Sequence, residues 1–193
     1  MITQIDVRET ARRYLQSYPN EQARLTHFLS YLEEDKNIFD RKNASGHVTA
    51  SGVVLSRDRM KLLLVNHLFL QRYIQPGGHV EPEDSLIRNA LREIEEETGI
   101  SSGALQHIGS EDYPLDIDSH PIPENPKKNE APHFHFDFRY LFQLSEDVDL
   151  VPQEDEVSDL RWFDMNDPIV QNAIGGVCVD KAVKILISSK HGT

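Results

Sequence analysis

The chain has 193 residues, of which 32 are acidic and 20 basic, so its formal net charge is −12. Such a negative surface repels phosphate backbones, which argues against nonspecific binding of DNA or RNA. No apolar run approaches the roughly 20 residues that a membrane-spanning helix needs, and the polar first residues do not resemble a secretory signal. The single cysteine, Cys178, excludes an internal disulfide and fits a reducing compartment. We therefore expect one globular, cytoplasmic domain.

The first 40 residues predict two amphipathic helices. Apolar residues recur at helical spacing over residues 5–17, where the stripe consists of Ile5, Ala11, Tyr14 and Leu15. Pro19 suits the first turn of a second helix at about residues 20–34, whose apolar face consists of Leu25, Phe28, Leu29 and Leu32. We expect residues 1–40 to form an N-terminal helical extension that serves packing or dimerisation rather than catalysis.

The next part of the chain predicts a β-hairpin followed by a helix. Residues 47–56 and 60–69 are rich in β-branched and apolar side chains, and a polar turn separates them. After a Pro-Gly-Gly break, Asp84 or Ser85 can cap the start of a helix, and Gly99 suits its end. The apolar face of this helix consists of Ile87, Ala90, Leu91 and Ile94. Residues 103–117 predict a further strand or two.

The last third of the chain contains the clearest strand pattern. Residues 118–132 hold four prolines and no periodicity, so we expect a loop there. Residues 133–144 alternate strictly and predict a strand, with Phe134, Phe136, Phe138, Tyr140 and Phe142 on one face. After an acidic loop, residues 160–165 predict a short strand and residues 180–190 a C-terminal helix. Strands that interleave with helices indicate the α/β fold class.

Three carboxylates share one face of the predicted central helix. Glu93, Glu96 and Glu97 have the spacing i, i+3 and i+4, and their face lies opposite the apolar one, away from the core. Like charges at this spacing cost a few tenths of a kcal/mol per pair, whereas a divalent cation such as Mg²⁺ would make the cluster favourable. The alternative is a solvated charged face. Gly77 and Gly78 precede the helix, where backbone can approach a ligand and offer a carbonyl to metal.

Residues 78–100 resemble the Nudix box: Gly, five residues, Glu, seven residues, then Arg-Glu-apolar-any-Glu-Glu-any-Gly-apolar. Gly78 is the box glycine, and residues 92–100 read Arg-Glu-Ile-Glu-Glu-Glu-Thr-Gly-Ile. The one departure is Asp84 at the first glutamate, which in the family supports the motif by pairing with the box arginine, here Arg92. The shorter aspartate implies a looser or water-bridged pairing. The resemblance covers residues 45–188 and implies an α/β/α sandwich around a mixed sheet, with the N-terminal extension outside the common core.

The resemblance also implies a reaction, the hydrolysis of a phosphoanhydride bond with Mg²⁺ or Mn²⁺. The implied metal ligands are Glu93, Glu96, Glu97 and the Gly77 carbonyl, and Arg92, Glu93 and Glu96 are expected to serve catalysis. The general base is either Glu93 or a glutamate of the later acidic loop. In that loop Glu154 is the first candidate by its distance from Trp162, and Glu156 is the second. The alternative is that this loop is simply solvated.

Candidate substrate-binding residues lie on the polar face of residues 133–144. If that face lines a groove, His133 or His135 can contact phosphate or base, and Arg139 can bind phosphate bidentately; if it is an outer face, they have no special role. His79, in the box loop, either contacts substrate or faces solvent. We also expect the lysine pair of the proline-rich loop to meet substrate phosphate. Tyr73 either stacks on a base or, as we rather expect, is a partly buried tyrosine at a strand end. His67 and His120 are weaker candidates still, and the lysine pair consists of Lys127 and Lys128.

Two classes of function are compatible with these residues. The first is a Nudix pyrophosphohydrolase whose substrate is a small nucleotide derivative, such as a nucleotide sugar, a dinucleotide or a noncanonical nucleoside triphosphate. The alternative is a Nudix-fold sensor that binds nucleotide without turnover, although such proteins usually lose the box glutamates. RNA 5′-end processing shares the chemistry, but the chain lacks a basic stripe. We expect no membrane partner, and homodimerisation is left open.

Overall fold

The computed structural model describes residues 1–34, 36–110, 113–126 and 129–189. Their strands form one eight-stranded mixed sheet in which β1 and β7 are parallel neighbours and the other pairs are antiparallel. The path β3-β2-β1-β7-β5 is extended by β4 on β1, β6 on β7 and β8 on β2. The strands are β1 (His47–Leu55), β2 (Lys61–His67), β3 (Arg72–Ile74), β4 (Gly77–His79), β5 (Leu105–His107), β6 (Asp116–Ile122), β7 (His133–Leu144) and β8 (Val157–Asp164).

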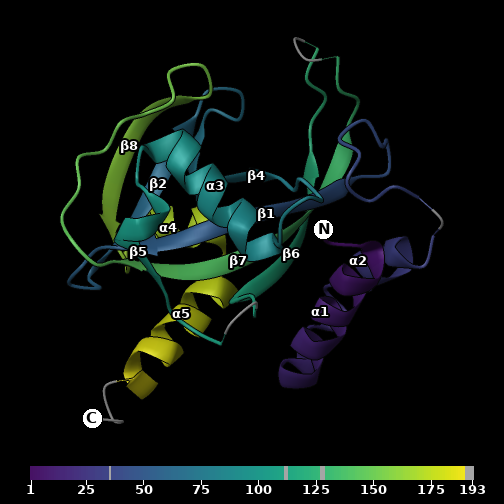
Figure 1. Ribbon diagram of the computed structural model, residues 1–193, viewed down its shortest axis with the longest axis horizontal. Coiled ribbons are helices and arrows are strands. Elements are labelled where there is room, and N and C mark those ends of the chain that lie inside the picture. Colours follow the sequence, from purple (N-terminus) through teal and green to yellow (C-terminus); the bar gives the residue numbers. More distant parts are fainter. Residues whose placement is uncertain (35, 111–112, 127–128, 190–193) are drawn as a thin grey trace.

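Helices cover both faces of the sheet (Figure 1). On one face the buried aromatic side chains of β7 pack with α1, α2 and α3, and on the other Val53, Leu64 and Leu141 pack with α4 and α5. The expected α/β/α sandwich around a mixed sheet is confirmed. The helices are α1 (Gln4–Ser17), α2 (Thr26–Leu32), α3 (Leu86–Thr98), α4 (Pro168–Ile174) and α5 (Gly176–Ser189). Among the described residues, no helix combines the length and apolar character that crossing a membrane requires.

The predicted hairpin and the predicted long strand are confirmed. β1 pairs with β2 in the antiparallel register Val54↔Leu63, and β7 has the bounds that alternation predicted. Phe136, Phe138 and Phe142 are fully buried because their face of β7 meets the helices.

The predicted N-terminal helices form, but with a different apolar stripe and a break. In α1, Ile5 is 68% exposed, whereas Val7, Ala11 and Tyr14 are buried. Their spacing of i, i+4 and i+7 keeps these three on one side of the helix. The predicted helix at residues 20–34 is a 3₁₀ turn at Pro19–Glu21 followed by α2.

Two other segments differ from expectation. The predicted loop at residues 118–132 begins as strand, because β6 continues to Ile122. Pro121 is tolerated there because β6 pairs only with β7 and so lies at a sheet edge. Helix α4 was not predicted, although Asp167 caps it and Pro168 occupies its first turn, which are common signals of a helix start.

Helix α3 has the expected ends and lies close to β1. The Ser85 side chain accepts a hydrogen bond from the Arg88 amide, and Gly99 ends the helix with a left-handed φ of 73°. A Cβ placed on Gly52 of β1 would lie 2.3 Å from Ile94 Cδ1. Because Gly52 has no side chain, α3 can pack directly on the sheet. We call α3 the box helix, since it carries the second block of the Nudix box.

The N-terminal helices join the same core as the sheet. Val7 and Tyr14 of α1 belong to the hydrophobic cluster that contains the buried aromatics of β7. Asp116 of β6 accepts hydrogen bonds from the Tyr14 hydroxyl at 2.9 Å, Arg24 Nη2 at 2.9 Å and Lys181 Nζ at 2.7 Å. This buried network, which we call the Asp116 cluster, links α1 and the segment before α2 to β6 and α5. The division into residues 1–40 and 45–188 stays a prediction.

Candidate active site

A cavity of about 630 Å³ lies where β1, β4 and β7 meet the box helix. Its walls include side chains of α3, of the loop before β8 and of the junction between α4 and α5, so it combines segments from most of the chain. On β1 and β7 the side chains of one sheet face change from polar to apolar along the strands. Polar side chains lie at the cavity, and the apolar side chains of Val53, Leu55 and Leu141 lie in the core. The site is therefore one end of a continuous sheet face.

The box glutamates Glu93, Glu96 and Glu97 line this cavity. Glu97 is only 2% exposed, and its Oε2 accepts a hydrogen bond from the Gly77 amide at 3.0 Å. The Glu93 side chain is 12% exposed, whereas Glu96 lies at the solvent side. The alternative of a fully solvated face is therefore wrong, because β4 and the later acidic loop cover the inner two carboxylates.

The glycines before the helix are required by space. A Cβ on Gly78 would lie 2.5 Å from Glu93 Oε2, and one on Gly77 would lie 2.2 Å from Ser51 Cβ. The first distance places the Glu93 carboxylate directly against the box loop. Backbone and carboxylates thus share a small volume, as a compact cation site needs.

Burial changes the protonation of the inner carboxylates. It raises the pKa of Glu93 to about 7, although neighbouring Arg92 lowers it, and the pKa of Glu97 to about 8, although the Gly77 amide lowers it. The nearby charges of Glu96 and Glu156 contribute to both of these raised pKa values. Crowded carboxylates of this kind fit a divalent cation, because hard cations take oxygen ligands and favour the ionised form.

Arg92 holds the outer part of the box together. Its Nη1 donates to Glu96 at 3.0 Å, and its Nη2 donates to the His79 carbonyl at 2.8 Å and contacts Glu93 Oε1 at 2.8 Å. The expected partner Asp84 instead lies 3.8 Å from Arg88 Nε, one helical turn along. The loop is fixed directly through the His79 backbone carbonyl, and the looser or water-bridged pairing of Asp84 with Arg92 stays a prediction.

The later acidic loop contributes a different glutamate from the one preferred. Glu154 is exposed and does not line the cavity, whereas Glu156 does. The reason is the turn at residues 154–156, which directs its last residue inward just before β8 begins at Val157. Gln153 also lines the cavity, and its backbone N–H donates to the backbone carbonyl of Glu97 at 3.3 Å. The order of the two candidates is reversed.

The polar face of β7 lines the cavity, so of the two alternatives given for this face, a groove wall or an outer surface, the groove wall is the one observed. Asp137 accepts hydrogen bonds from Ser51 at 2.7 Å, Thr49 at 3.1 Å and Gln75 at 3.0 Å. These bonds satisfy a carboxylate that is only 3% exposed. Asp137 therefore braces β1 against β7.

Arg139 does not present a free guanidinium to phosphate. It is 5% exposed, its Nε donates to Asp137 at 3.0 Å, and its Nη2 donates to Asp118 at 2.8 Å. Its Nη1 donates to the Ile174 carbonyl at 2.7 Å. The predicted bidentate phosphate contact is not retained, because carboxylates and a carbonyl already occupy the fork.

The predicted histidines line the cavity. His79, His133 and His135 do so with their rings close together, and His67 and His120, which were weaker candidates, line it as well. Sequence reasoning missed His47, which lies opposite His135 in the parallel β1–β7 pair. No local pattern predicts that pairing, which joins strands far apart in the chain. The cavity also contains three arginines that were not predicted, Arg24, Arg41 and Arg72.

Two further candidates change status. Tyr73 does not line the cavity; its hydroxyl donates to Asp159 at 2.5 Å, and its ring packs edge-on against Phe163. Its role in base stacking is not retained. Lys127 and Lys128 lie outside the described residues, so their predicted contact with phosphate stays a prediction.

Comparison with known proteins gives the family. The NUDIX domain model matches residues 46–176. A curated relative, the probable DHNTP pyrophosphohydrolase of Lactococcus lactis subsp. cremoris (strain MG1363), is 32% identical over 143 residues, which are 74% of this chain and 78% of the relative. The chain therefore belongs to the Nudix family of pyrophosphohydrolases, as the box at residues 78–100 implied. Members of this family generally use divalent metal ions.

Solved structures show the same fold. The C. elegans Ap4A hydrolase in its binary complex has a TM-score of 0.55 at 20% identity, covering 73% of this chain and 98% of that one. The E. coli dihydroneopterin triphosphate pyrophosphohydrolase has a TM-score of 0.54 at 16% identity, covering 73% and 95%. At these identities the likeness establishes the mixed sheet with flanking helices and nothing finer.

Proposed function

We propose that the chain uses Mg²⁺ or Mn²⁺ to hydrolyse a phosphoanhydride bond in a nucleoside diphosphate linked to another group. The observation that carries this proposal is the pair of buried carboxylates, Glu93 and Glu97, in a cavity beside the box glycines. A cavity of about 630 Å³ matches the size of ordinary small-ligand sites. Burying two carboxylates side by side is costly, and this cost supports a role in binding a cation.

The roles of the box residues follow from their positions. Glu93, Glu96 and Glu97, with the Gly77 carbonyl, would hold the cation. When bound, it supplies charge neutralisation for the diphosphate in the ground and transition states. Arg92 keeps Glu93 and Glu96 in place through its contacts with both carboxylates. Arg92 is a positioning residue, since its guanidinium contacts Glu93, Glu96 and the His79 carbonyl of the box.

The general base is proposed to be Glu156 or Glu93. Glu156 reaches the cavity from the loop before β8 and is not one of the proposed cation ligands, so it can accept a proton while those ligands stay in place. Glu93 has a pKa of about 7, which suits proton transfer near neutral pH. Glu154 is no longer a candidate because it is exposed outside the cavity.

The histidine-lined wall of the cavity is proposed to bind the part of the substrate beyond the diphosphate. His79, His133 and His135 line the cavity there. Nucleotide sugars, dinucleotides and noncanonical nucleoside triphosphates are all candidates. The name of the Lactococcus relative adds dihydroneopterin triphosphate to them. The buried free thiol of Cys178 is compatible with action in a reducing cytoplasm, which we also propose. Homodimerisation stays a prediction.

The proposal is tested by a substrate panel. Purified protein with Mg²⁺ or Mn²⁺ is incubated with nucleoside diphosphate derivatives, nucleoside triphosphates and dihydroneopterin triphosphate, and phosphate and pyrophosphate products are measured. Glu97→Gln should abolish turnover. The matched control is Glu95→Gln, an exposed glutamate of the same helix, which should retain it. Nucleotide binding by calorimetry without any turnover across the panel would instead indicate a sensor.

A further inference from the structure

Five histidines gather beside the cavity, and four of them, His79, His120, His133 and His135, line it. The ring of His47 lies 4.4 Å from that of His79, 4.9 Å from that of His133 and 4.7 Å from that of His135, centre to centre. His120 adds a fifth ring 5.8 Å from His135. These residues come from β1, β4, β6 and β7, so only the folded sheet brings them together. The function proposed above gives no role to His47 or His120 and does not require His133 and His135 to converge on His47.

His47 is the most unusual member. It is 1% exposed, and neither of its ring nitrogens has a hydrogen-bond partner within the described part of the chain. Buried polar groups are nearly always paired, so an unpaired imidazole needs an explanation. Burial, with His79 and His133 nearby, lowers the pKa of His47 to about 3. Its ring is therefore neutral and keeps a free nitrogen lone pair.

His133 is oriented as a ligand. Its Nδ1 lies 2.7 Å from the Ala131 carbonyl oxygen. Because a carbonyl can only accept, Nδ1 carries the hydrogen, and in the neutral ring Nε2 is the nitrogen that keeps a lone pair. A backbone carbonyl that fixes one ring nitrogen while the other binds metal is the common arrangement of metal-ligating histidines. His133 is 7% exposed, so the arrangement is shielded from bulk water.

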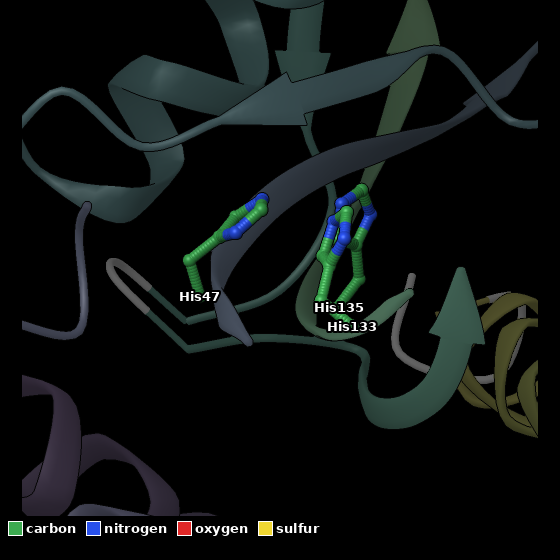
Figure 2. Close-up of side chains that lie close together, drawn as sticks. All are labelled: His47, His133 and His135. Carbon is green, nitrogen blue, oxygen red and sulfur yellow. The ribbon is translucent and has the colours of Figure 1, made fainter. Parts of the chain in front are cut away.

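The third ring completes a convergent set. One ligand nitrogen from each of His47, His133 and His135 lies within 4.8 Å of the others, and Figure 2 shows the His47 ring directed toward the other two. A tetrahedral zinc site with Zn–N distances of about 2.0–2.1 Å places its nitrogens about 3.4 Å apart. Small rotations of the rings about their side-chain bonds therefore reach it. Burial with the other histidines keeps the pKa of His135 well below its usual value, so this ring is also neutral.

We propose that His47, His133 and His135 form a second metal site, for a transition-metal dication such as Zn²⁺, apart from the carboxylate site of the box. Imidazole nitrogens suit Zn²⁺, whereas Mg²⁺ prefers oxygen ligands. His133 and His135 also line the cavity, so a metal ion held by them would lie where bound substrate or water can reach it. The inference goes beyond the proposed hydrolysis and does not rest on it. Binding of phosphate by these rings is less favoured, because the lowered pKa values of His47 and His135 leave these two rings without positive charge.

The test measures metal binding rather than activity. Protein freed of any affinity tag and of metal is titrated with Co²⁺ in excess Mg²⁺, so that the box carboxylates are already occupied. We expect one Co²⁺ per chain with the strong visible absorption of a four-coordinate nitrogen site, and its displacement by Zn²⁺. His133→Asn and His135→Asn should each weaken binding at least about 100-fold, the upper range for loss of a mere supporting contact.

Two controls separate this site from others. His27→Asn changes an exposed histidine on α2, and Glu97→Gln impairs the box; both variants should retain the Co²⁺ spectrum. Circular dichroism confirms that the histidine variants are folded. Binding that is lost in Glu97→Gln but kept in His133→Asn and His135→Asn would overturn the proposal in favour of the carboxylates. Failure of the folded wild-type protein to bind Co²⁺ or Zn²⁺ would overturn it as well.

Discussion

The two buried glutamates of the box make the metal-free protein sensitive to pH. Glu93 and Glu97 have folded-state pKa values of about 7 and about 8, above the ordinary value of 4.5. Between pH 4.5 and pH 8 the folded state therefore binds more protons than the unfolded state, and the free energy of unfolding falls as pH rises. A bound cation removes this penalty because it favours the ionised carboxylates.

This linkage gives a first prediction. In the presence of a chelator, the free energy of unfolding should fall between pH 5 and pH 8, with Glu97 contributing on the order of 3 kcal/mol. Glu97→Gln, which cannot ionise, should show a shallower slope when urea denaturation is followed at both pH values. Mg²⁺ should restore stability at pH 8 in the wild-type protein. Equal slopes for the two proteins would contradict the assigned burial of Glu97.

The choice of general base gives a second prediction. Glu156→Gln should lower kcat about 100-fold or more with little change in KM, because general-base catalysis contributes this much. Glu154→Gln, two residues away and exposed, should leave kcat unchanged. Steady-state kinetics of both variants, with the pH profile of kcat, decide the matter. If Glu156→Gln keeps both its kcat and the fall of kcat at acid pH that marks the general base, Glu93 becomes the base.

At the scale of elements, two glycines serve the box helix in different ways. Gly78 makes room for the Glu93 carboxylate, whereas Gly52 makes room for Ile94 in the interface between α3 and β1. A Cβ at either position would come closer than 3.0 Å to its neighbour. The neighbours differ in freedom: a carboxylate at the cavity can rotate away, and a buried isoleucine cannot.

A pair of alanine substitutions separates these roles. Gly78→Ala should displace Glu93 and lower kcat about 100-fold, as small misplacements of catalytic groups do, while the free energy of unfolding changes by less than about 1 kcal/mol. Gly52→Ala should overpack the core and cost roughly 1–3 kcal/mol. Activity assays and urea denaturation of both variants give the comparison. A stable, fully active Gly78→Ala protein would show that Glu93 need not approach the loop.

At the scale of the whole molecule, the Asp116 cluster joins the N-terminal helices to the sheet and to α5. Asp116 is 1% exposed and is contacted by Tyr14, Arg24, Arg139 and Lys181. Lys181 Nζ also contacts Glu21 at 2.6 Å. Breaking a buried ion pair by removing one partner is strongly destabilising, because the other charge loses its compensation.

Removal of one cation from this cluster gives the fourth prediction. Lys181→Met should lower the free energy of unfolding by about 3 kcal/mol and Tm by roughly 6–12 °C for a chain of this size. Lys184→Met, on the same helix but exposed, should change stability by less than about 0.5 kcal/mol. Thermal unfolding followed by circular dichroism compares them. Equal Tm values would mean that α5 and the N-terminal helices are held by apolar packing alone.

What the sequence by itself determined is local. The period of the helix places Glu93, Glu96 and Glu97 on one face, and strict alternation predicts β7 with its bounds, since both patterns depend only on neighbours along the chain. The box spacing predicted the family for the same reason. These features specify the carboxylate half of the site before any contact is known.

What only the tertiary structure decided depends on pairing and burial between distant segments. The parallel β1–β7 pair brings His47 to His135. Asp118 and Asp137 accept hydrogen bonds from the guanidinium of Arg139, which the sequence had suggested as a phosphate-binding group. The inward end of one turn selects Glu156 over Glu154. Register, desolvation and charge compensation arise from atoms far apart in the chain, and no local periodicity encodes them.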